Sequence, residues 1–319
     1  MPSYDITTGD AYFFDIQRRV VANRTSEAWQ APHGSIGLEL DVTELMALVR
    51  RLRSAPEFEG VRVTFNSALL KVIAEGLLKA PEMNAHLEYN AATAVGKITC
   101  ADRVNIAIPL RIGRGHTITP VLEDVGAKSL REVSVAMEEL KRRAKNTNVP
   151  LLLREAGVRD TRRRLLRGDL RVLRRLWPNF VGKARLHRPS RAEWREYHAV
   201  PESDRITPEN LVSATTLVSN IGSVLPQTPI QVHLLEVIPP QTTAFGVGPV
   251  QRKPVVRTRE DGEEELGIRS MMTLTICLDH RAMDLEHMLG FINRVTELCA
   301  APEQLAGTRI SEEALRACN

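Results

Sequence analysis

The chain has 319 residues, of which 43% are hydrophobic and 26% are charged, enough apolar material for one large or two small globular domains. Its first residues, MPSYDITTGDAYFF, are polar and acidic where a signal peptide would be basic and then apolar. No apolar run approaches the roughly 18 residues of a membrane span. The sequence therefore excludes a membrane-spanning helix, and we expect a cytoplasmic protein.

The four cysteines are scattered, with no CxxC pair and no Cys/His spacing typical of a metal site. We expect reduced, structural thiols and no bound metal. The cysteines are Cys100, Cys277, Cys299 and Cys318.

The first elements predicted along the chain are three helices and a strand. FDIQRRVVANR is typical of a short helix that carries Arg18. GSIGLELDVTELMALVRRLR changes from strand alternation to helical spacing, and the helix starts at Asp41 or Thr43. FNSALLKVIAEGLLKAPE predicts a second amphipathic helix, which Asn66 caps and Pro81 stops.

After Val95 the hydrophobic period changes to two. Apolar residues alternate from Val104 to Ile112, and a glycine-containing turn leads into HTITPVLEDV, so we expect a strand and a hairpin. Helical spacing returns after Ser129. The C-terminal third predicts a loop at EDGEEELG, a final helix, and strands at TTLVS, IQVHLLEVI, TTAFGVG, PVVRTR and MMTLTICL.

Strands interleaved with helices, many of them joined as hairpins, predict a two-layer α/β sandwich with a mixed β-sheet covered by helices. We expect a single domain over residues 1–319, interrupted by an insertion at about 147–205.

The insertion differs from the rest of the chain in charge. The protein has a net charge of +4, but residues 151–198 contain 14 Arg and Lys against 5 Asp and Glu, so the remainder is negative by about five charges. RRRLLRGDLRVLRRLWPNF predicts a basic amphipathic helix. Its apolar face holds Leu166, Leu170, Leu173 and Trp177, and its basic face holds Arg163, Arg164, Arg167, Arg171, Arg174 and Arg175.

Three partners suit this helix. It can pack on its own subunit or on a neighbouring one, which we favour, or it can lie on an anionic membrane surface through residues 150–198. Nucleic acid is the least favoured partner, because arginines attract phosphate but no binding motif is recognised.

LDHRAMDLEH follows the apolar strand SMMTLTICLD and places His280 and Asp284 four residues apart. An imidazole at a strand end can act as a general base near neutral pH, and a carboxylate after it can stiffen the turn. Because such a pair also arises by chance, the spacing alone leaves a second interpretation open, a structural histidine bonded to a backbone carbonyl.

Several motifs in the same order resemble the catalytic domain of the 2-oxoacid dehydrogenase acyltransferases (the dihydrolipoamide acyltransferase components), relatives of chloramphenicol acetyltransferase. LTICLDHRAMDL resembles the family's LSxDHRxxDG, and TTLVSNIG with a later TPI resembles TFTISNLG with TPI. VNIAIPLRIGRGHTITPVLEDVGAKSLREV resembles NIGVAVDTPRGLIVPVIRDADRKSLxEI, and RRVVA, APHGSIGLELDVTEL, APEMNA and AAPEQL also fall in family order. The resemblance spans nearly all of the chain except the basic insertion. It implies a chloramphenicol-acetyltransferase-like fold.

The resemblance also implies a role for each of five residues. His280 is the implied general base that takes the proton of a thiol, either coenzyme A or dihydrolipoamide. Ser219 is the implied donor to the oxyanion of the tetrahedral intermediate, and Asn220 beside it is implied in binding coenzyme A. Asp284 is the implied orienting carboxylate, and Arg18 is the candidate for its ionic partner. No metal is required.

In the family, the histidine and the serine meet across a subunit boundary inside a trimer. We therefore expect a homotrimer, or a larger core of several trimers, that uses acyl-coenzyme A and a dihydrolipoamide-like acceptor. No lipoyl or peripheral-subunit-binding domain is recognised in the chain, so we expect the acyl arm on a separate lipoyl or acyl carrier protein.

The chain departs from the family motif at Leu285, which stands where the family has glycine, a residue that permits close backbone approach. The insertion and the C-terminal AGTRISEEALRACN are further departures. The alternative function is therefore a weak or inactive acyltransferase-like scaffold or assembly protein, associated with a membrane surface through its arginine-rich insertion.

Overall fold

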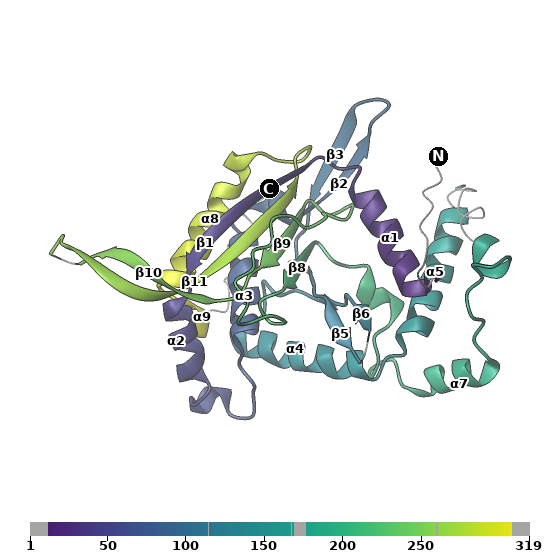
Figure 1. The fold of residues 1–319 in the computed structure, drawn as a ribbon, viewed down its shortest axis with the longest axis horizontal. Coiled ribbons are helices and arrows are strands. Elements are labelled where there is room, and N and C mark those ends of the chain that lie inside the picture. The colour runs from purple at the N-terminus through teal and green to yellow at the C-terminus, as the bar shows by residue number, and fades with distance from the viewer. Residues whose placement is uncertain (1–11, 114, 167, 169–176, 260, 308–319) are drawn as a thin grey trace, which may run out of the picture.

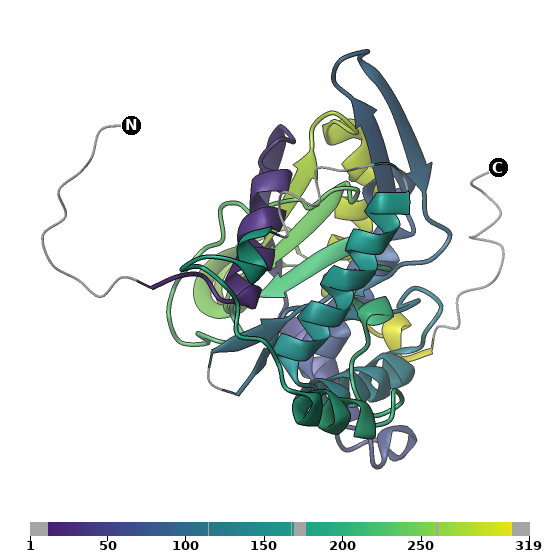
Figure 2. The same ribbon diagram turned by 90° about the vertical axis from the view of Figure 1, so that its right-hand side faces the viewer.

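The computed structural model describes residues 12–113, 115–166, 168, 177–259 and 261–307, which form a mixed β-sheet packed against helices (Figures 1 and 2). The helices are α1 (Ile16–Ala28), α2 (Thr43–Leu52), α3 (Phe65–Leu77), α4 (Leu130–Lys145), α5 (Val149–Leu166), α7 (Arg191–Ala199), α8 (Leu285–Ala300) and α9 (Gln304–Gly307). The strands are β1 (His33–Asp41), β2 (Ala85–Asn90), β3 (Val95–Cys100), β4 (Ile106–Ala107), β5 (Leu110–Ile112), β6 (His116–Ile118), β7 (Val121–Leu122), β8 (Thr216–Asn220), β9 (Thr243–Val247), β10 (Gln251–Thr258) and β11 (Glu264–Asp279).

The main sheet has the strand order β1-β11-β9-β8-β4-β7, and β10 pairs with the first half of β11. β8 runs parallel to both of its neighbours, β9 and β4, whereas the other neighbouring strands are antiparallel. Two further hairpins, β2–β3 and β5–β6, lie outside this sheet. The predicted α/β sandwich with a mixed sheet is confirmed.

The main core lies between the sheet and the helices α3 and α8. The ring of Phe245 on β9 stacks on the ring of Phe291 on α8, with centroids 5.1 Å apart. The two helices approach each other closely where each has a glycine. A Cβ atom on Gly290 of α8 would lie 2.2 Å from the carbonyl oxygen of Lys79, and one on Gly76 of α3 would lie 2.7 Å from the Phe291 ring. No larger side chain fits at this crossing.

The prediction that α3 is amphipathic is wrong, because every residue from Ser67 to Leu77 is buried. Lys71 is fully buried, and its Nζ donates to the carbonyl oxygen of Gly126 (2.8 Å) and lies 2.9 Å from Glu75 Oε1. The predicted cap is also wrong. Thr64 caps the helix by accepting a hydrogen bond from the backbone N–H of Ser67. Asn66 instead accepts a hydrogen bond from Asn220 at the end of β8.

The predicted strand IQVHLLEVI is wrong as well, since residues 230–238 pair with no strand. The strands over which the segment lies, β9 and β11, already have a strand on both sides. The segment crosses the sheet face opposite the main core, where Val232 packs over Gly246. Its backbone bonds to side chains instead: the N–H of Leu235 donates to Cys277 Sγ, and that of Val237 donates to His33 Nε2 (2.9 Å).

The alternating segment from Val104 to Ile112 forms two short strands, β4 and β5, instead of one. Pro109 lies between them and has no N–H for a ladder hydrogen bond. The hairpin after it, β5–β6, is confirmed, with Ile112 opposite His116.

The insertion begins with α5, whose first turn buries Val149, Leu151 and Leu152. α5 ends at Leu166, so much of the predicted basic amphipathic helix, residue 167 and residues 169–176, lies outside the described residues.

Replacement of Gly290 by alanine should lower the free energy of unfolding by about 1–3 kcal/mol, because the methyl group must push α8 away from Lys79. Gly157→Ala on α5 is the matched control, since no atom lies within 4 Å of a Cβ there. It should be neutral or stabilising by up to about 1 kcal/mol. Urea unfolding followed by circular dichroism measures both, and equal stability of the two variants would contradict the close crossing.

Candidate active site

His280 lies at the corner where β11 ends and α8 is about to begin. Its Nδ1 is 3.3 Å from Asp284 Oδ1, and both side chains are exposed, by 56% and 74%. The backbone N–H of His280 donates to the carbonyl oxygen of Pro32 (2.9 Å), which fixes the main chain of the corner. The two residues that the motif predicted to act together are therefore in contact, and Nε2 of His280 is bonded to no described residue.

The residues on either side of His280, the buried Asp279 and the more exposed Arg281, form a support that the sequence reasoning missed. Asp279 is 2% exposed, and its carboxylate accepts two hydrogen bonds from the guanidinium of Arg281 (2.9 and 2.6 Å). These bonds raise the pKa of Arg281 above its usual range. The guanidinium also lies over the ring of Tyr89 on β2, 5.1 Å from its centroid. The DHR motif contains both residues, so an aspartate and an arginine two positions apart were the sequence signal that could have predicted this ion pair.

Asp284 precedes the first turn of α8 and is held by His287. The N–H of Asp284 donates to Nδ1 of His287 (3.2 Å), so this nitrogen carries the lone pair. Leu285, which replaces the family's glycine, has helical backbone geometry and a side chain 57% exposed. Within one chain, Leu285 therefore neither strains the turn nor fills a cavity.

Ser219 and Asn220 end the parallel strand β8. The hydroxyl of Ser219 is half-buried and has no hydrogen-bond partner in the described ranges. Both ends of the Asn220 amide are hydrogen-bonded: its Nδ2 donates to Asn66 Oδ1 at the start of α3 (2.8 Å), and its Oδ1 accepts from the N–H of Ser223 (2.8 Å). Gly222 follows, where a Cβ would lie 2.4 Å from the carbonyl oxygen of Gly248. Asn220 thus fixes the turn after Ser219, and coenzyme A binding by Asn220 stays a prediction.

One chain does not bring Ser219 and His280 together. Ser219 pairs with Gly246 on β9, and Gly246 pairs with Thr275 on β11, so Ser219 is level with Thr275 and five residues short of His280. At roughly 3.4 Å per residue and 4.8 Å between strands, the two residues are about 17 Å apart along the strands and about 10 Å across them. No side chain spans that separation.

Arg18 lies on α1 with an exposed side chain. Its backbone N–H donates to Oδ1 of Asp15, the residue that caps the helix (2.7 Å). In the described part of the chain the carboxylate of Asp284 faces His280, and the pairing of Arg18 with Asp284 stays a prediction.

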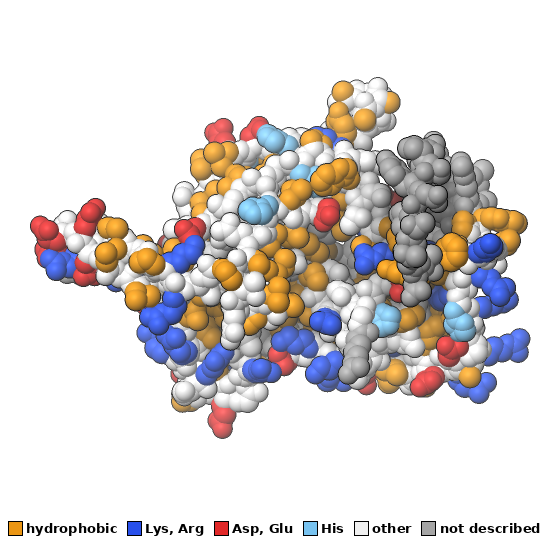
Figure 3. Space-filling model, in the orientation of Figure 1, with side chains coloured by type: hydrophobic (Ala, Val, Ile, Leu, Met, Phe, Trp, Pro, Cys, Tyr) orange, Lys and Arg blue, Asp and Glu red, His pale blue; other side chains and the backbone are white. Residues whose placement is uncertain are grey.

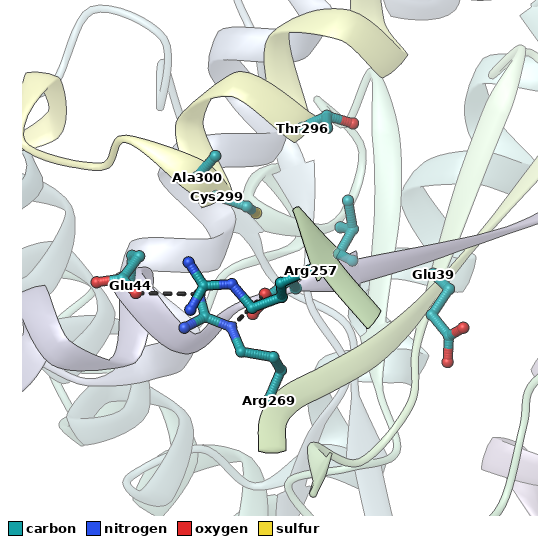
Figure 4. Close-up of a pocket in the computed structure, with 9 residues that line it drawn as sticks. Glu39, Glu44, Arg257, Arg269, Thr296, Cys299 and Ala300 are labelled. Atoms are coloured by element: carbon teal, nitrogen blue, oxygen red, sulfur yellow. Dashed lines mark hydrogen bonds and ion pairs between the residues drawn. The ribbon is translucent and has the colours of Figure 1, made fainter. Parts of the chain in front are cut away.

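A hollow of about 460 Å³ lies at the base of the β10–β11 hairpin and contains none of the predicted site residues (Figure 4). Arg269 crosses it, donating to Asp41 Oδ2 (2.6 Å) and to Glu44 Oε1 (3.0 Å). Burial works to raise the pKa of Asp41, but hydrogen bonds from Thr43 and Arg269 outweigh burial and lower it. These bonds fasten the hairpin to β1 and α2.

The described residues contain no cluster of three or more histidine, cysteine or acidic side chains that could hold a metal ion. None of the helices in the described ranges combines the length and the apolar character that crossing a membrane requires. Cys277 and Cys299 are buried, and burial raises the pKa of both thiols, that of Cys299 to about 12. Neither thiol is suited to act as a nucleophile, because the thiolate is the reactive form.

A model of the 2-oxoacid dehydrogenases acyltransferase (catalytic domain) matches residues 13–151 and 190–307. The chain belongs to this family, as its motifs indicated. The two matched stretches leave out residues 152–189, which lie within the basic insertion.

Individual relatives agree with the family. The dihydrolipoyllysine-residue acetyltransferase component of the pyruvate dehydrogenase complex of Mycobacterium bovis is 26% identical over 271 residues, which are 84% of this chain and 37% of that protein. The chain thus spans little more than a third of that relative. The cubic core of the pyruvate dehydrogenase multienzyme complex and the dihydrolipoamide acetyltransferase of Azotobacter vinelandii have the same fold. Each is 18% identical, with a TM-score of 0.65, over 96% of this chain and 98% of theirs.

The buried cysteines should be unreactive in the folded protein. In a Cys318→Ser background, which removes the thiol outside the described residues, we expect Cys100 alone to react rapidly with DTNB at pH 8. Cys277 and Cys299 should react only after unfolding, because burial disfavours their thiolates. Counting the thiols released with and without guanidinium checks this, and rapid reaction of two or more in the native protein would refute it.

Proposed function

We propose that this chain forms a trimeric acyltransferase that moves an acyl group between coenzyme A and a thiol acceptor of the dihydrolipoamide type. Family membership supports the class of reaction, and the name of the Mycobacterium bovis relative supports the acceptor. The observation that carries the proposal is the placement of Nε2 of His280 and the hydroxyl of Ser219, neither of which has a partner among the described residues. They lie at the fixed ends of β11 and β8, two strands that β9 separates.

The imidazole of His280 serves as the general base. The carboxylate of Asp284 beside Nδ1 favours a proton on that nitrogen, which leaves Nε2 to accept the proton of the attacking thiol. A free thiol with a pKa of about 8.5 is mostly protonated at neutral pH, so this proton transfer supplies the nucleophile. The imidazolium then returns the proton to the thiolate that leaves.

The hydroxyl of Ser219 stabilises the intermediate. Attack of the thiolate on the thioester carbonyl carbon forms a tetrahedral oxyanion, which accepts a hydrogen bond from Ser219 Oγ. The turn held by Asn220, Asn66 and Ser223 fixes the strand end, so the donor is positioned before the charge develops. The oxyanion collapses with loss of the second thiolate, and no acyl-enzyme forms.

The two groups meet only if successive copies contribute them. The separation within one chain supports a site completed by the base of one copy and the oxyanion donor of the next, a contact between different surfaces that closes into a ring. Three copies then contain three equivalent sites.

Two further parts of the proposal concern partners. The acyl group arrives on a separate lipoyl or acyl carrier, and trimers associate into a larger core. Likeness to a chain of the cubic pyruvate dehydrogenase core supports such an assembly. The Azotobacter vinelandii structure comes from an investigation of a serine, a histidine and an asparagine in its catalytic mechanism, with the asparagine four positions after the histidine. His280 and Asp284 have the same spacing.

Single replacements test the chemical roles. With acetyl-coenzyme A and dihydrolipoamide, His280→Ala should lower kcat by about 10²–10⁴-fold through loss of the base. Ser219→Ala should lower it by about 10²–10³-fold, and Ser219→Thr, which keeps the hydroxyl, should retain more activity. Chromatography of the acylated dihydrolipoamide measures each rate, and His198→Ala on α7 is the control. Product formation at the same background level by wild type and His280→Ala would favour the inactive scaffold.

Mixed trimers test the sharing of the site. His280→Ala and Ser219→Ala chains, refolded together in equal amounts, should recover activity that neither shows alone. In a head-to-tail ring every mixed trimer has one intact site of three, so random mixing gives about a quarter of the wild-type rate. Each variant refolded alone is the control. A mixture no more active than its components would place both groups of each site in one chain.

A further inference from the structure

The β10–β11 hairpin projects from one end of the long axis of the molecule (Figure 1). Its strands pair from Gln251 opposite Met271 to Thr258 opposite Glu264. Pro254 lies opposite Ile268 and Val256 opposite Leu266, so these four side chains share one face of the hairpin. Val256, Leu266 and Ile268 are 57%, 79% and 65% exposed. An exposed apolar face on a projecting hairpin is typical of a binding surface.

The tip of this hairpin is acidic. Asp261 is paired with Arg259, but the exposed carboxylates of Glu263, Glu264 and Glu265 have no cationic partner among the described residues. Glu264 is two residues before Leu266, so it extends the apolar face with a negative charge.

The hairpin is fastened at its base, which fixes the direction in which it projects. Arg269 on β11 is bonded to Asp41 and Glu44 (Figure 4), and Lys253 on β10 is paired with Glu39 on β1. Two ion pairs to β1 and one to α2 hold both strands of the hairpin against the body.

The insertion presents the opposite charge at the other end of the long axis (Figures 1 and 3). It exposes apolar side chains at Trp177, Phe180 and Val181. It also exposes cations that form no ion pair within the described residues, namely Arg162, Arg163, Lys183, Arg185, Arg188, Arg191 and Arg195.

The insertion is also held in place. Tyr197 of α7 donates to Glu155 of α5 (2.9 Å) and accepts from the buried Arg205 (2.7 Å), whose guanidinium lies over the Tyr197 ring. Burial, followed by the bond to Glu155, raises the pKa of Tyr197. The basic surface is therefore preorganised for a partner.

We propose that the β10–β11 hairpin of one copy docks, through its apolar face and acidic tip, on the basic insertion of the next. The two surfaces are at opposite ends of one chain and match in kind: an apolar face with carboxylates at its tip on one, and exposed apolar side chains together with unpaired cations on the other. A contact between different surfaces is the type that sharing of His280 and Ser219 already requires, so the inference rests on the proposed trimer. The pairing adds an intersubunit clamp that relatives without residues 152–189 lack.

Charge reversal in the full-length protein tests the clamp. Glu263→Lys/Glu264→Lys/Glu265→Lys should raise the dissociation constant of the trimer by about tenfold or more, and Arg185→Glu/Arg188→Glu/Arg191→Glu should do the same. Combining both sets should restore the constant to within about threefold of wild type, because the charges again match. Sedimentation velocity at low salt measures the constants, and about 0.5 M salt should weaken the wild-type contact.

The control reverses three exposed acids elsewhere, Glu57, Glu59 and Glu88, and should leave the trimer intact. Unchanged assembly of the hairpin variant, or failure of the combined variant to recover, would overturn the clamp. If the wild type is then still a trimer and mixed trimers are active, the proposed function stands without the clamp. A monomeric wild type would reject both the clamp and the proposed function. Loss of binding to phosphatidylserine vesicles in the arginine variant, with its trimer unchanged, would assign the insertion to a lipid surface and also overturn the clamp.

Discussion

The register that joins β8, β9 and β11 decides what a single chain of this protein can do. Parallel pairing of β8 with β9, and antiparallel pairing of β9 with β11, sends Ser219 and His280 toward opposite ends of the sheet. A shift of one residue would turn the side chain of Ser219 to the other face. Since buried side chains on β9 and β11 fix that register against α3 and α8, the core itself keeps the two groups apart.

Both side chains are accessible to solvent, but hydrogen bonds and ion pairs hold the main chain that carries each of them. His280 is exposed, but the main chain around it is held by the carbonyl oxygen of Pro32 and by the ion pair between the buried Asp279 and Arg281. Ser219 is followed by a turn in which the side-chain amide of Asn220 donates a hydrogen bond to Asn66 on α3. A reactive side chain held by its neighbours and left open on one side is suited to a surface that another copy completes.

The sequence predicted most of the fold because its signals are local. The helix α4, the β5–β6 hairpin and the contact of His280 with Asp284 follow from spacing within a few residues. Residues 230–238 have the composition of a strand, but they cross the face of β9 and β11, which are paired on both sides, and that depends on how distant strands pair. The burial of Lys71 on α3 was equally hidden, because its partner Gly126 is far along the chain.

The central claim is that the imidazole and the hydroxyl converge from two copies, and a cryo-EM structure of the assembled protein with bound coenzyme A examines it directly. The claim predicts the coenzyme A thiol in a cleft between subunits, with His280 of one copy on one side and Ser219 of the next on the other. A map in which both residues face solvent, or in which the thiol lies within one subunit away from them, would contradict it.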